Sequence, residues 1–135
     1  MGRVLAIDYG LKRCGIAVSD PTGTISQPLK TLPTTELLGF LKEYIPSAGV
    51  RELVIGYPLN LDGSPTELTP VVEQLAEDLE REFGLSVHFI DERFTSRWAE
   101  RQLAGNSSRK KKQWTDALAA TNILETFLLK QKQIQ

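Results

Sequence analysis

The stretch VLAIDYGLKRCGIAVSD, residues 4–20, decides the fold class of this chain. Two apolar runs, at 3–8 and 13–19, are separated by only a few residues around 10–12. A connection this short predicts that the two runs form an antiparallel hairpin. The first run ends in Asp8, and a carboxylate at the end of a buried strand is costly unless it is paired. The first question is therefore what Asp8 binds.

The rest of the chain predicts an α/β domain. Further strands are expected at 25–31, 52–58 and 86–90, and helices at about 35–45, 69–84, 95–105 and 114–131. This order predicts three antiparallel strands followed by parallel strands with helical crossovers, which gives a five-stranded mixed sheet flanked by helices. With 135 residues, the chain is expected to form a single domain over 1–135.

Two helix boundaries are predicted from local signals. The first helix should bury one face and be closed by Pro46 and Gly49, whereas the second should have Thr69 as N-cap and Pro70 at its first position. The residues of the first buried face are Leu37, Leu38, Leu41, Tyr44 and Ile45.

Composition excludes several classes of protein. Sixteen Lys and Arg balance seventeen Asp and Glu, so an anionic partner must be held by a local basic patch. A single cysteine, Cys14, and a single histidine, His88, exclude a disulfide framework and a Cys/His zinc site. Cys14 is expected to be a buried, inert thiol. The start of the chain does not have the pattern of a signal peptide, and no apolar run reaches the ~20 residues that span a bilayer. A cytoplasmic protein without membrane contact is expected.

Acidic residues end two of the predicted strands. Asp8 ends the strand at 3–8, and Asp91 and Glu92 follow the strand at 86–90. If these strands are parallel neighbours, their carboxylates should lie within a few ångströms of each other. Strand alternation leaves open whether Asp91 or Glu92 faces Asp8.

A third carboxylate is expected from the last helix. Asp116 shares a helical stripe with Ala120, Ile123 and Phe127, so it should point toward the sheet. Acidic groups without Cys or His suit a hard cation, Mg²⁺ or Mn²⁺, and that cation is the predicted partner of Asp8.

Each carboxylate also has a purely structural explanation. Asp8 could accept backbone hydrogen bonds in the turn that follows it. Asp91 or Glu92 could pair with Arg93 or cap the next helix. Asp116 lies in a first helical turn, where acids are favoured by the helix dipole. The case for a metal site therefore depends on the convergence of these residues.

Four sequence blocks, in this order and spacing, resemble the YqgF (RuvX) family: AIDYGLKRCGIAVSD, GYPLNLDGS, DERFTS and TDALAATNIL. The resemblance covers nearly the whole chain and implies an RNase H-like fold. It also implies a nuclease that matures the 5′ end of precursor small-subunit (16S) ribosomal RNA in ribosome biogenesis, or a Holliday junction resolvase. Cys14 departs from the pattern, in which a branched aliphatic residue is expected.

The resemblance implies a catalytic site made of Asp8, the acidic pair Asp91-Glu92, and Asp116. Asp8, Glu92 and Asp116 are the implied metal ligands, with Glu92 favoured over Asp91. Two divalent ions about 3.5–4 Å apart could activate water and stabilise the leaving oxygen of a phosphodiester. Asp8 would bridge both ions. His88 is expected to be a structural strand residue rather than a base.

Basic residues near the carboxylates are candidates for phosphate binding. Lys12 and Arg13 lie in the hairpin beside Asp8, and Arg93 follows the acidic pair. Lys110 and Lys111 belong to a basic run before Asp116. Each of these residues could instead be solvated or ion-paired. The expected partners are precursor ribosomal RNA or branched DNA, and ribosomal particles.

Parts of the sequence also fit two other functions. Asp8-Tyr9-Gly10 also resembles the phosphate-binding start of actin-like ATPases and sugar kinases, but those proteins need a second comparable domain, and no P-loop motif is present. A nucleic-acid-binding factor without catalysis is the other rival, although Asp8, Glu92 and Asp116 are all retained. A monomer and a homodimer are both compatible with the sequence; a junction resolvase should be a symmetric dimer.

Overall fold

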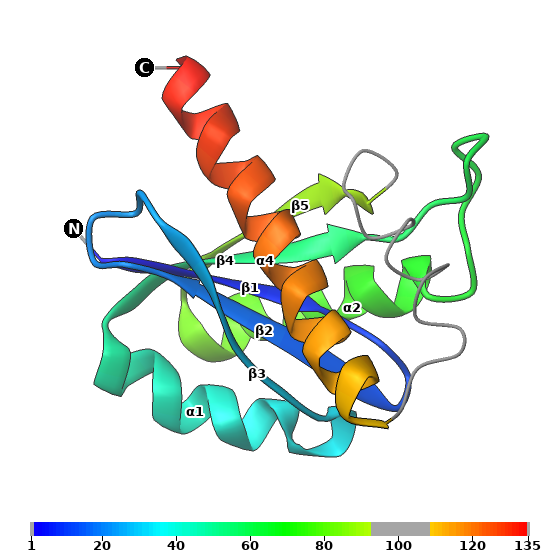
Figure 1. The fold of residues 1–135 in the computed structure, drawn as a ribbon, viewed down its shortest axis with the longest axis horizontal. Helices are drawn as coiled ribbons and strands as arrows, with labels where there is room; N and C mark the ends of the chain where they lie inside the picture. The colour runs from blue at the N-terminus through cyan, green and yellow to red at the C-terminus, as the bar shows by residue number, and fades with distance from the viewer. Residues whose placement is uncertain (1, 93–108, 135) are drawn as a thin grey trace.

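The computed structural model describes residues 2–92 and 109–134. In this part of the chain, a five-stranded sheet has the order β3-β2-β1-β4-β5 (Figure 1). The strands are β1 (Arg3–Asp8), β2 (Arg13–Ser19), β3 (Ser26–Pro33), β4 (Val50–Tyr57) and β5 (Ser86–Asp91). β1, β2 and β3 are antiparallel, and β4 and β5 run parallel to β1. The predicted mixed sheet and hairpin are confirmed.

Helices cover both faces of the sheet. The short 3-10 helix η1 (Thr34–Glu36) leads into α1 (Leu37–Ala48), and α2 (Thr69–Phe83) follows β4. α1 and α2 pack on one face, whereas the long α4 (Arg109–Ile134) crosses the other face diagonally (Figure 1). No helix within the two described ranges is both long and apolar enough to cross a membrane.

The apolar residues of β1 divide between these two faces. Leu5 and Ile7 pack with α1 and α2, and Val4 and Ala6 pack with α4. Successive side chains of a strand point to opposite faces. Asp8 continues the set of Val4 and Ala6, so its side chain lies on the α4 face.

The first helix runs past its predicted end at 45 and past Pro46, but it is closed by Gly49 as predicted. α1 runs through Pro46 to Ala48, and Gly49 follows it with a left-handed backbone. Pro46 removes one donor close to the end of the helix, but Ala48 still packs against the core, which supports the last turn. Leu38 is 46% exposed and does not belong to the buried face that was predicted for it.

The other two described helices begin earlier than the sequence predicts. The N-cap of α2 is Leu68, because the hydroxyl of Thr69 donates to the carbonyl of Pro58 and fastens the preceding loop. α4 begins at Arg109, so the basic run is helical. The helix predicted near 95–105 lies outside the described residues.

Candidate metal and nucleic-acid site

The carboxyl end of β1 is the centre of the candidate site. Asp8 pairs with Gly15 of β2, and the pairing of Ile7 with Ile55 places Gly56 of β4 on its other side. Asp8 is 3% exposed. A buried carboxylate therefore lies between two residues that have no side chain.

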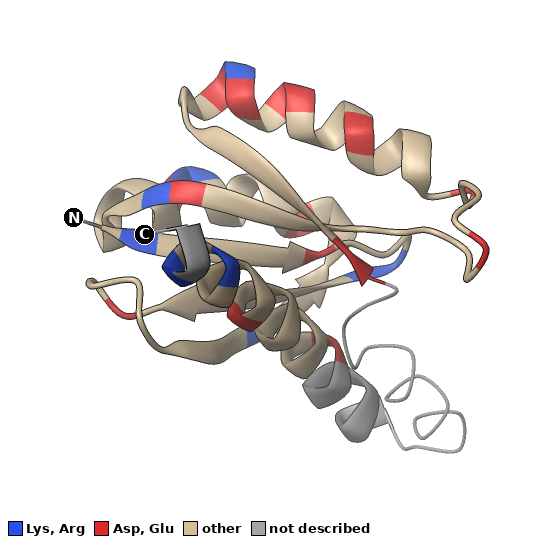
Figure 2. Cartoon of the chain, turned by 90° about the horizontal axis from the view of Figure 1, so that it is seen from above, with Lys and Arg blue, Asp and Glu red and all other residues tan. Residues whose placement is uncertain are grey.

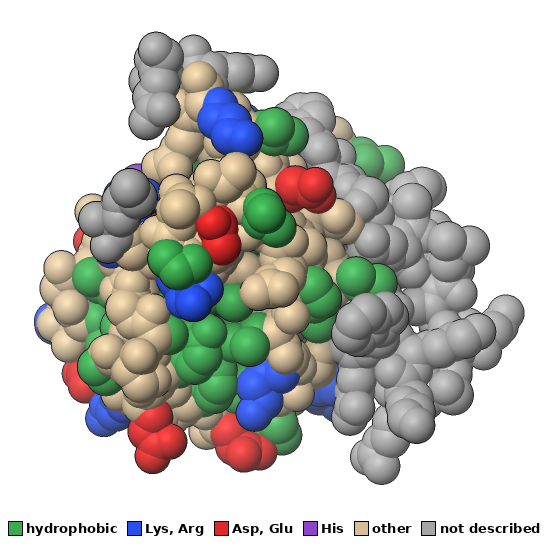
Figure 3. Space-filling model, turned by 60° about the vertical axis from the view of Figure 1, so that its left-hand side comes forward, with side chains coloured by type: hydrophobic (Ala, Val, Ile, Leu, Met, Phe, Trp, Pro, Cys, Tyr) green, Lys and Arg blue, Asp and Glu red, His purple; other side chains and the backbone are tan. Residues whose placement is uncertain are grey.

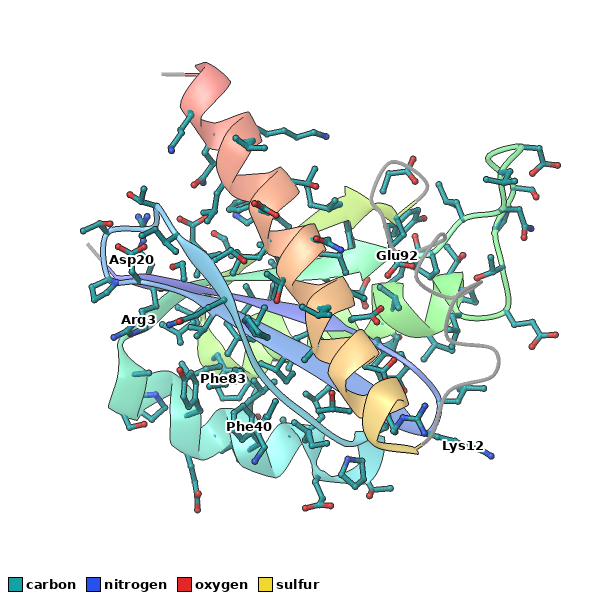
Figure 4. All side chains as sticks on the ribbon, in the orientation of Figure 1. Arg3, Lys12, Asp20, Phe40, Phe83 and Glu92 are labelled. Carbon is teal, nitrogen blue, oxygen red and sulfur yellow. The ribbon has the colours of Figure 1, made fainter. Side chains whose placement is uncertain are left out.

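Gly56 leaves room for the carboxylate of Glu92. A Cβ atom at Gly56 would lie 2.3 Å from Glu92 Oε1 and 2.7 Å from Ile123 Cδ1. The Glu92 side chain therefore reaches back over β4 toward the face on which α4 packs, at the sheet edge where Figure 4 labels it. Glu92 is 8% exposed, so it is a second buried carboxylate, and it lies over Gly56 of the strand next to β1.

The strand order differs from the arrangement in which the strands of Asp8 and Glu92 are direct neighbours. β1 and β5 are not neighbours, because β4 lies between them. The carboxylate of Glu92 lies over the backbone of Gly56, in the strand between them. Asp91 alternates with Ile90, which packs against α4, so it belongs to the opposite face of β5. The structure therefore brings Glu92, and not Asp91, onto the face that holds Asp8.

Gly15 allows α4 to approach the sheet closely. A Cβ atom at Gly15 would lie 1.9 Å from the carbonyl oxygen of Asp116 and 2.9 Å from the backbone nitrogen of Ala117. The helix turn that carries Asp116 therefore rests directly on the backbone of β2. The stripe predicted to face the sheet is confirmed, since all three of its apolar members are buried: Ala120, Ile123 and Phe127.

The carboxylate of Asp116 has an identified partner. Arg13 Nε donates to Asp116 Oδ2 at 3.0 Å, and the two side chains are 37% and 28% exposed. The guanidinium predicted to bind phosphate thus holds a predicted metal ligand. The ion pair also ties the start of β2 to α4.

The electrostatics of Cys14 show that the site is negative. Burial raises the pKa of the fully buried Cys14 thiol, and the negative charges of Asp8 and Asp116 raise it further. Hydrogen bonds from Thr34 and the backbone at Gly10 oppose the shift. The thiol stays protonated at neutral pH, in agreement with the inert role predicted for it. One carboxylate on β1 and one on α4 therefore both raise the pKa of the same thiol.

The donor set fits a hard divalent cation in its chemistry. It offers carboxylate oxygens only, which Mg²⁺ and Mn²⁺ prefer. A cation there would offset the repulsion between Asp8 and Glu92. In the described ranges, however, no three Asp, Glu, His or Cys side chains are gathered closely enough to hold one ion. Asp8 and Glu92 are both buried on the face that α4 covers, and Asp116 is paired with Arg13.

The remaining predicted residues are less closely tied to this centre. Lys12 is exposed and projects outward from the β1–β2 hairpin (Figure 4). The backbone of Lys110 and Lys111 forms the first turn of α4, while their side chains and the whole of Arg93 lie outside what the structure describes. His88 Nε2 lies 2.9 Å from Glu52 Oε2, consistent with the structural role expected for it.

Charge is distributed unevenly around the sheet. Acidic residues follow one another along α2 (Figure 2), whereas Lys12 lies in the connection between β1 and β2. On the flank seen in Figure 3, charges of both signs are interspersed with hydrophobic side chains. The carboxylates of α2 therefore disfavour the approach of a polyanion to that helix.

Reasoning from the sequence missed Gly15, whereas it placed Gly56 at the start of a loop, 56–63, whose glycines were expected to allow close backbone approach. Gly15 and Gly56 determine how closely Asp116 and Glu92 can approach Asp8. A glycine inside a strand pattern is a signal of close approach by another group. Both lay inside predicted strands, so this signal was present in the sequence.

Solved structures with a similar fold include those of RuvC from Thermus thermophilus. The chain aligns with RuvC of Thermus thermophilus with a TM-score of 0.58 and 10% identity, covering 97% of this chain and 96% of that one. RuvC of T. thermophilus in complex with a Holliday junction substrate gives a TM-score of 0.57 at 10% identity, with 98% and 97% covered. The RNase H-like fold is confirmed.

Curated relatives are more similar in sequence. Proteins named "Putative pre-16S rRNA nuclease" match from Amoebophilus asiaticus, with 38% identity over 98% of both chains, and from Koribacter versatilis, with 43% identity over 94% of this chain and 86% of the relative. A third, from Maridesulfovibrio salexigens, is 43% identical over 93% of this chain and 97% of the relative. The RuvX family model, described as a Holliday junction resolvase, matches residues 2–130. Because the family model covers nearly the whole chain and the relatives are about 40% identical over nearly their full length, the chain belongs to the RuvX family of nucleases.

Proposed function

We propose that this chain is a hydrolase of phosphodiester bonds that uses Mg²⁺ or Mn²⁺ to process the 5′ end of pre-16S ribosomal RNA in the cytoplasm. The observation that carries the proposal is the row Gly15–Asp8–Gly56, in which a buried carboxylate is flanked by two bare backbone positions. Glu92 occupies the space over one of them. The name shared by the curated relatives supports the choice of ribosomal RNA as substrate.

Asp8, Glu92 and Asp116 are the residues that would hold the metal. Divalent ions bound there would activate water and stabilise the leaving oxygen of the phosphodiester. Asp8 and Glu92 are positioned by burial, which limits the conformations that their side chains can adopt. Asp116 is positioned by Arg13 and would have to leave that partner, at least in part, to serve as a ligand. Lys12 is placed to bind a phosphate of the substrate strand next to Asp8.

Branched DNA is the second candidate substrate. It is favoured by the description of the family model and by the fold shared with RuvC. A carboxylate–metal centre attacks the phosphodiester itself and therefore does not distinguish RNA from DNA. The choice must come from surfaces around the centre.

A direct comparison of substrates tests the proposed function. The full chain is incubated with 5′-extended pre-16S RNA and with a four-way DNA junction, each in Mg²⁺, Mn²⁺ or EDTA. We expect cutting of the precursor in the presence of metal and none in EDTA. Preferential cutting of the junction would assign the resolvase activity. Binding without cutting of either substrate in any metal would overturn the nuclease proposal in favour of a binding factor.

Gly56→Ala should remove activity while leaving the fold intact. The new Cβ atom would overlap the ends of two flexible side chains, Glu92 and Ile123, so Glu92 must swing away from the centre. We expect cleavage to fall at least about tenfold, because displacing a group that supports a metal site costs about 10- to 100-fold. Overpacking should cost about 1–3 kcal/mol of stability. Single-turnover cleavage and thermal melting measure the two effects.

Gly39→Ala is the matched control for this substitution. Gly39 lies in α1, and an added Cβ atom there meets nothing within 4 Å. It should cleave like the unmodified protein. Unchanged cleavage by Gly56→Ala would show that the position of Glu92 does not matter to the reaction.

A further inference from the structure

A pocket opens at the same edge of the sheet as Asp8. It has a volume of about 440 Å³ and is lined by Tyr9, Pro70, Val71, Gln74, Leu75 and Asp78. This volume falls within the range of about 300–1,000 Å³ that is usual for sites that take small organic groups. Apart from Tyr9, every lining residue comes from one stripe of α2.

The lining combines an aromatic face with a polar end. Tyr9 supplies a ring, and Pro70, Val71 and Leu75 supply apolar walls. Gln74 Nε2 donates to Asp78 Oδ1 at 3.0 Å, and Arg81 Nη2 donates to the same oxygen at 2.5 Å. The amide oxygen of Gln74 and the second carboxylate oxygen of Asp78 can accept further hydrogen bonds. A flat, largely apolar group with N–H donors on its edge matches this pattern. A nucleobase with an exocyclic amino group is such a group.

The position of Tyr9 relates the pocket to the candidate centre. Tyr9 follows Asp8 directly, so their Cα atoms are about 3.8 Å apart. It packs against the core on the α1 and α2 side, whereas Asp8 faces α4. A nucleotide whose phosphate lies at Asp8 could therefore place its base around the sheet edge against Tyr9.

The charge of α2 restricts what can enter the pocket. Five carboxylates lie along this helix, at Glu73, Glu77, Asp78, Glu80 and Glu82. They repel a phosphate backbone but not an uncharged base. The substrate strand should therefore pass the β1–β2 hairpin near Lys12, with a single base turned into the pocket.

We infer that this pocket binds one unpaired nucleobase of the substrate strand, stacked on Tyr9 and hydrogen-bonded at its edge by Gln74 and Asp78. The inference rests on the proposed function, since it takes the strand to cross the centre at Asp8. The ligand is a nucleobase in either case, whether the substrate strand is RNA or DNA. Bases that carry an amino group are preferred to uracil and thymine, which present no amino donors.

Binding in EDTA tests this site separately from catalysis. The probes are fluorescein-labelled single-stranded RNA and DNA ten-mers of mixed sequence, and the same strands with abasic residues. We expect the strands with bases to bind about tenfold more tightly than the abasic ones, as is usual for stacking of one base on an aromatic ring. Titration of the ¹⁵N-labelled full chain with adenosine monophosphate should shift the amide signals of Tyr9, Val71 and Leu75.

Substitutions in the pocket provide the second arm. Tyr9→Leu should weaken binding of the base-containing strands about tenfold, and Tyr9→Phe should restore it. Val71→Phe, at an exposed position on the rim, fills the pocket and should also weaken binding of the base-containing strands about tenfold. This variant provides the test if Tyr9→Leu does not fold. Glu77→Gln, on α2 but outside the pocket, is the control and should bind like the unmodified protein.

Wild-type binding by both Tyr9→Leu and Val71→Phe, or signal shifts confined to other parts of the chain, would overturn the inference. If the pocket variants lose base binding but the unmodified protein shows no metal-dependent cutting, the base pocket is supported and the nuclease function is rejected. If the unmodified protein cuts in the presence of metal but the pocket variants bind strands as well as it does, only the base pocket is rejected. Tighter binding of a Lys-rich peptide than of any strand at these residues would identify the pocket as a protein-docking site and overturn its assignment to a base.

Discussion

Asp8→Asn is expected to abolish metal-dependent cleavage while leaving the protein folded. The substitution keeps the shape of a side chain that is 3% exposed, so packing between the two glycines is preserved. It removes the negative charge that a divalent cation requires. Loss of groups that merely support metal ligands costs about 10- to 100-fold, so loss of a direct ligand should cost at least about a hundredfold. Single-turnover cleavage of the preferred substrate in Mg²⁺ and Mn²⁺ measures this.

Glu43→Gln is the matched control, since it neutralises an exposed carboxylate on α1, on the opposite face of the sheet. It should cleave at the unmodified rate. Circular dichroism of both variants confirms that they are folded. If Asp8→Asn cleaves within a few-fold of the unmodified protein, Asp8 is a structural residue of the turn and not a ligand.

Gly15→Ala is expected to have the largest effect on stability. Its Cβ atom would lie 1.9 Å from the carbonyl oxygen of Asp116 and 2.3 Å from its carbonyl carbon. These atoms belong to the backbone of a long helix, so no side chain can rotate away, and α4 itself must shift. We expect a loss of about 3 kcal/mol, at the upper end of the usual range for overpacking. Thermal and urea unfolding measure it, with a fall in Tm on the order of 10 °C.

Gly39→Ala is the control, and it is expected to raise stability instead of lowering it. Its position is helical, exposed and free of neighbours, so alanine should stabilise the protein by about 0.5–1 kcal/mol. Gly15→Ala should also reduce cleavage, because Asp116 moves with α4. A Gly15→Ala variant that melts with the unmodified protein would show that α4 does not rest on β2 as described.

Most of the fold could be predicted from alternation and turns. The run at 3–8 alternates cleanly between two packed faces, and the hairpin follows from a short connection that cannot accommodate a crossover. Helix ends were harder to predict, because tertiary contacts override local signals. Ala48 packs beyond Pro46, and Thr69 uses its hydroxyl on a distant carbonyl instead of its own helix.

The site was predictable as a set of residue types but not as a geometry. The choice between Asp91 and Glu92 depended on which face of β5 meets α4, and a strand pattern alone does not contain that information. The insertion of β4 between β1 and β5 follows from sheet order, which depends on long-range pairing. The pairing of Arg13 with Asp116 joins residues 103 positions apart in the sequence. Gly15 and Gly56 provided the local signal that the chain leaves space beside Asp8.

The most direct test of the central claim is an anomalous difference map from crystals of the full chain grown with MnCl₂. We predict a manganese peak coordinated by Asp8 and Glu92, with Asp116 turned from Arg13 toward the ion. Loss of that peak in Asp8→Asn crystals grown in the same way would assign it to this carboxylate. Manganese bound only elsewhere on the protein, with Asp8 and Glu92 bonded solely to protein groups, would contradict the metal site and the nuclease mechanism built on it.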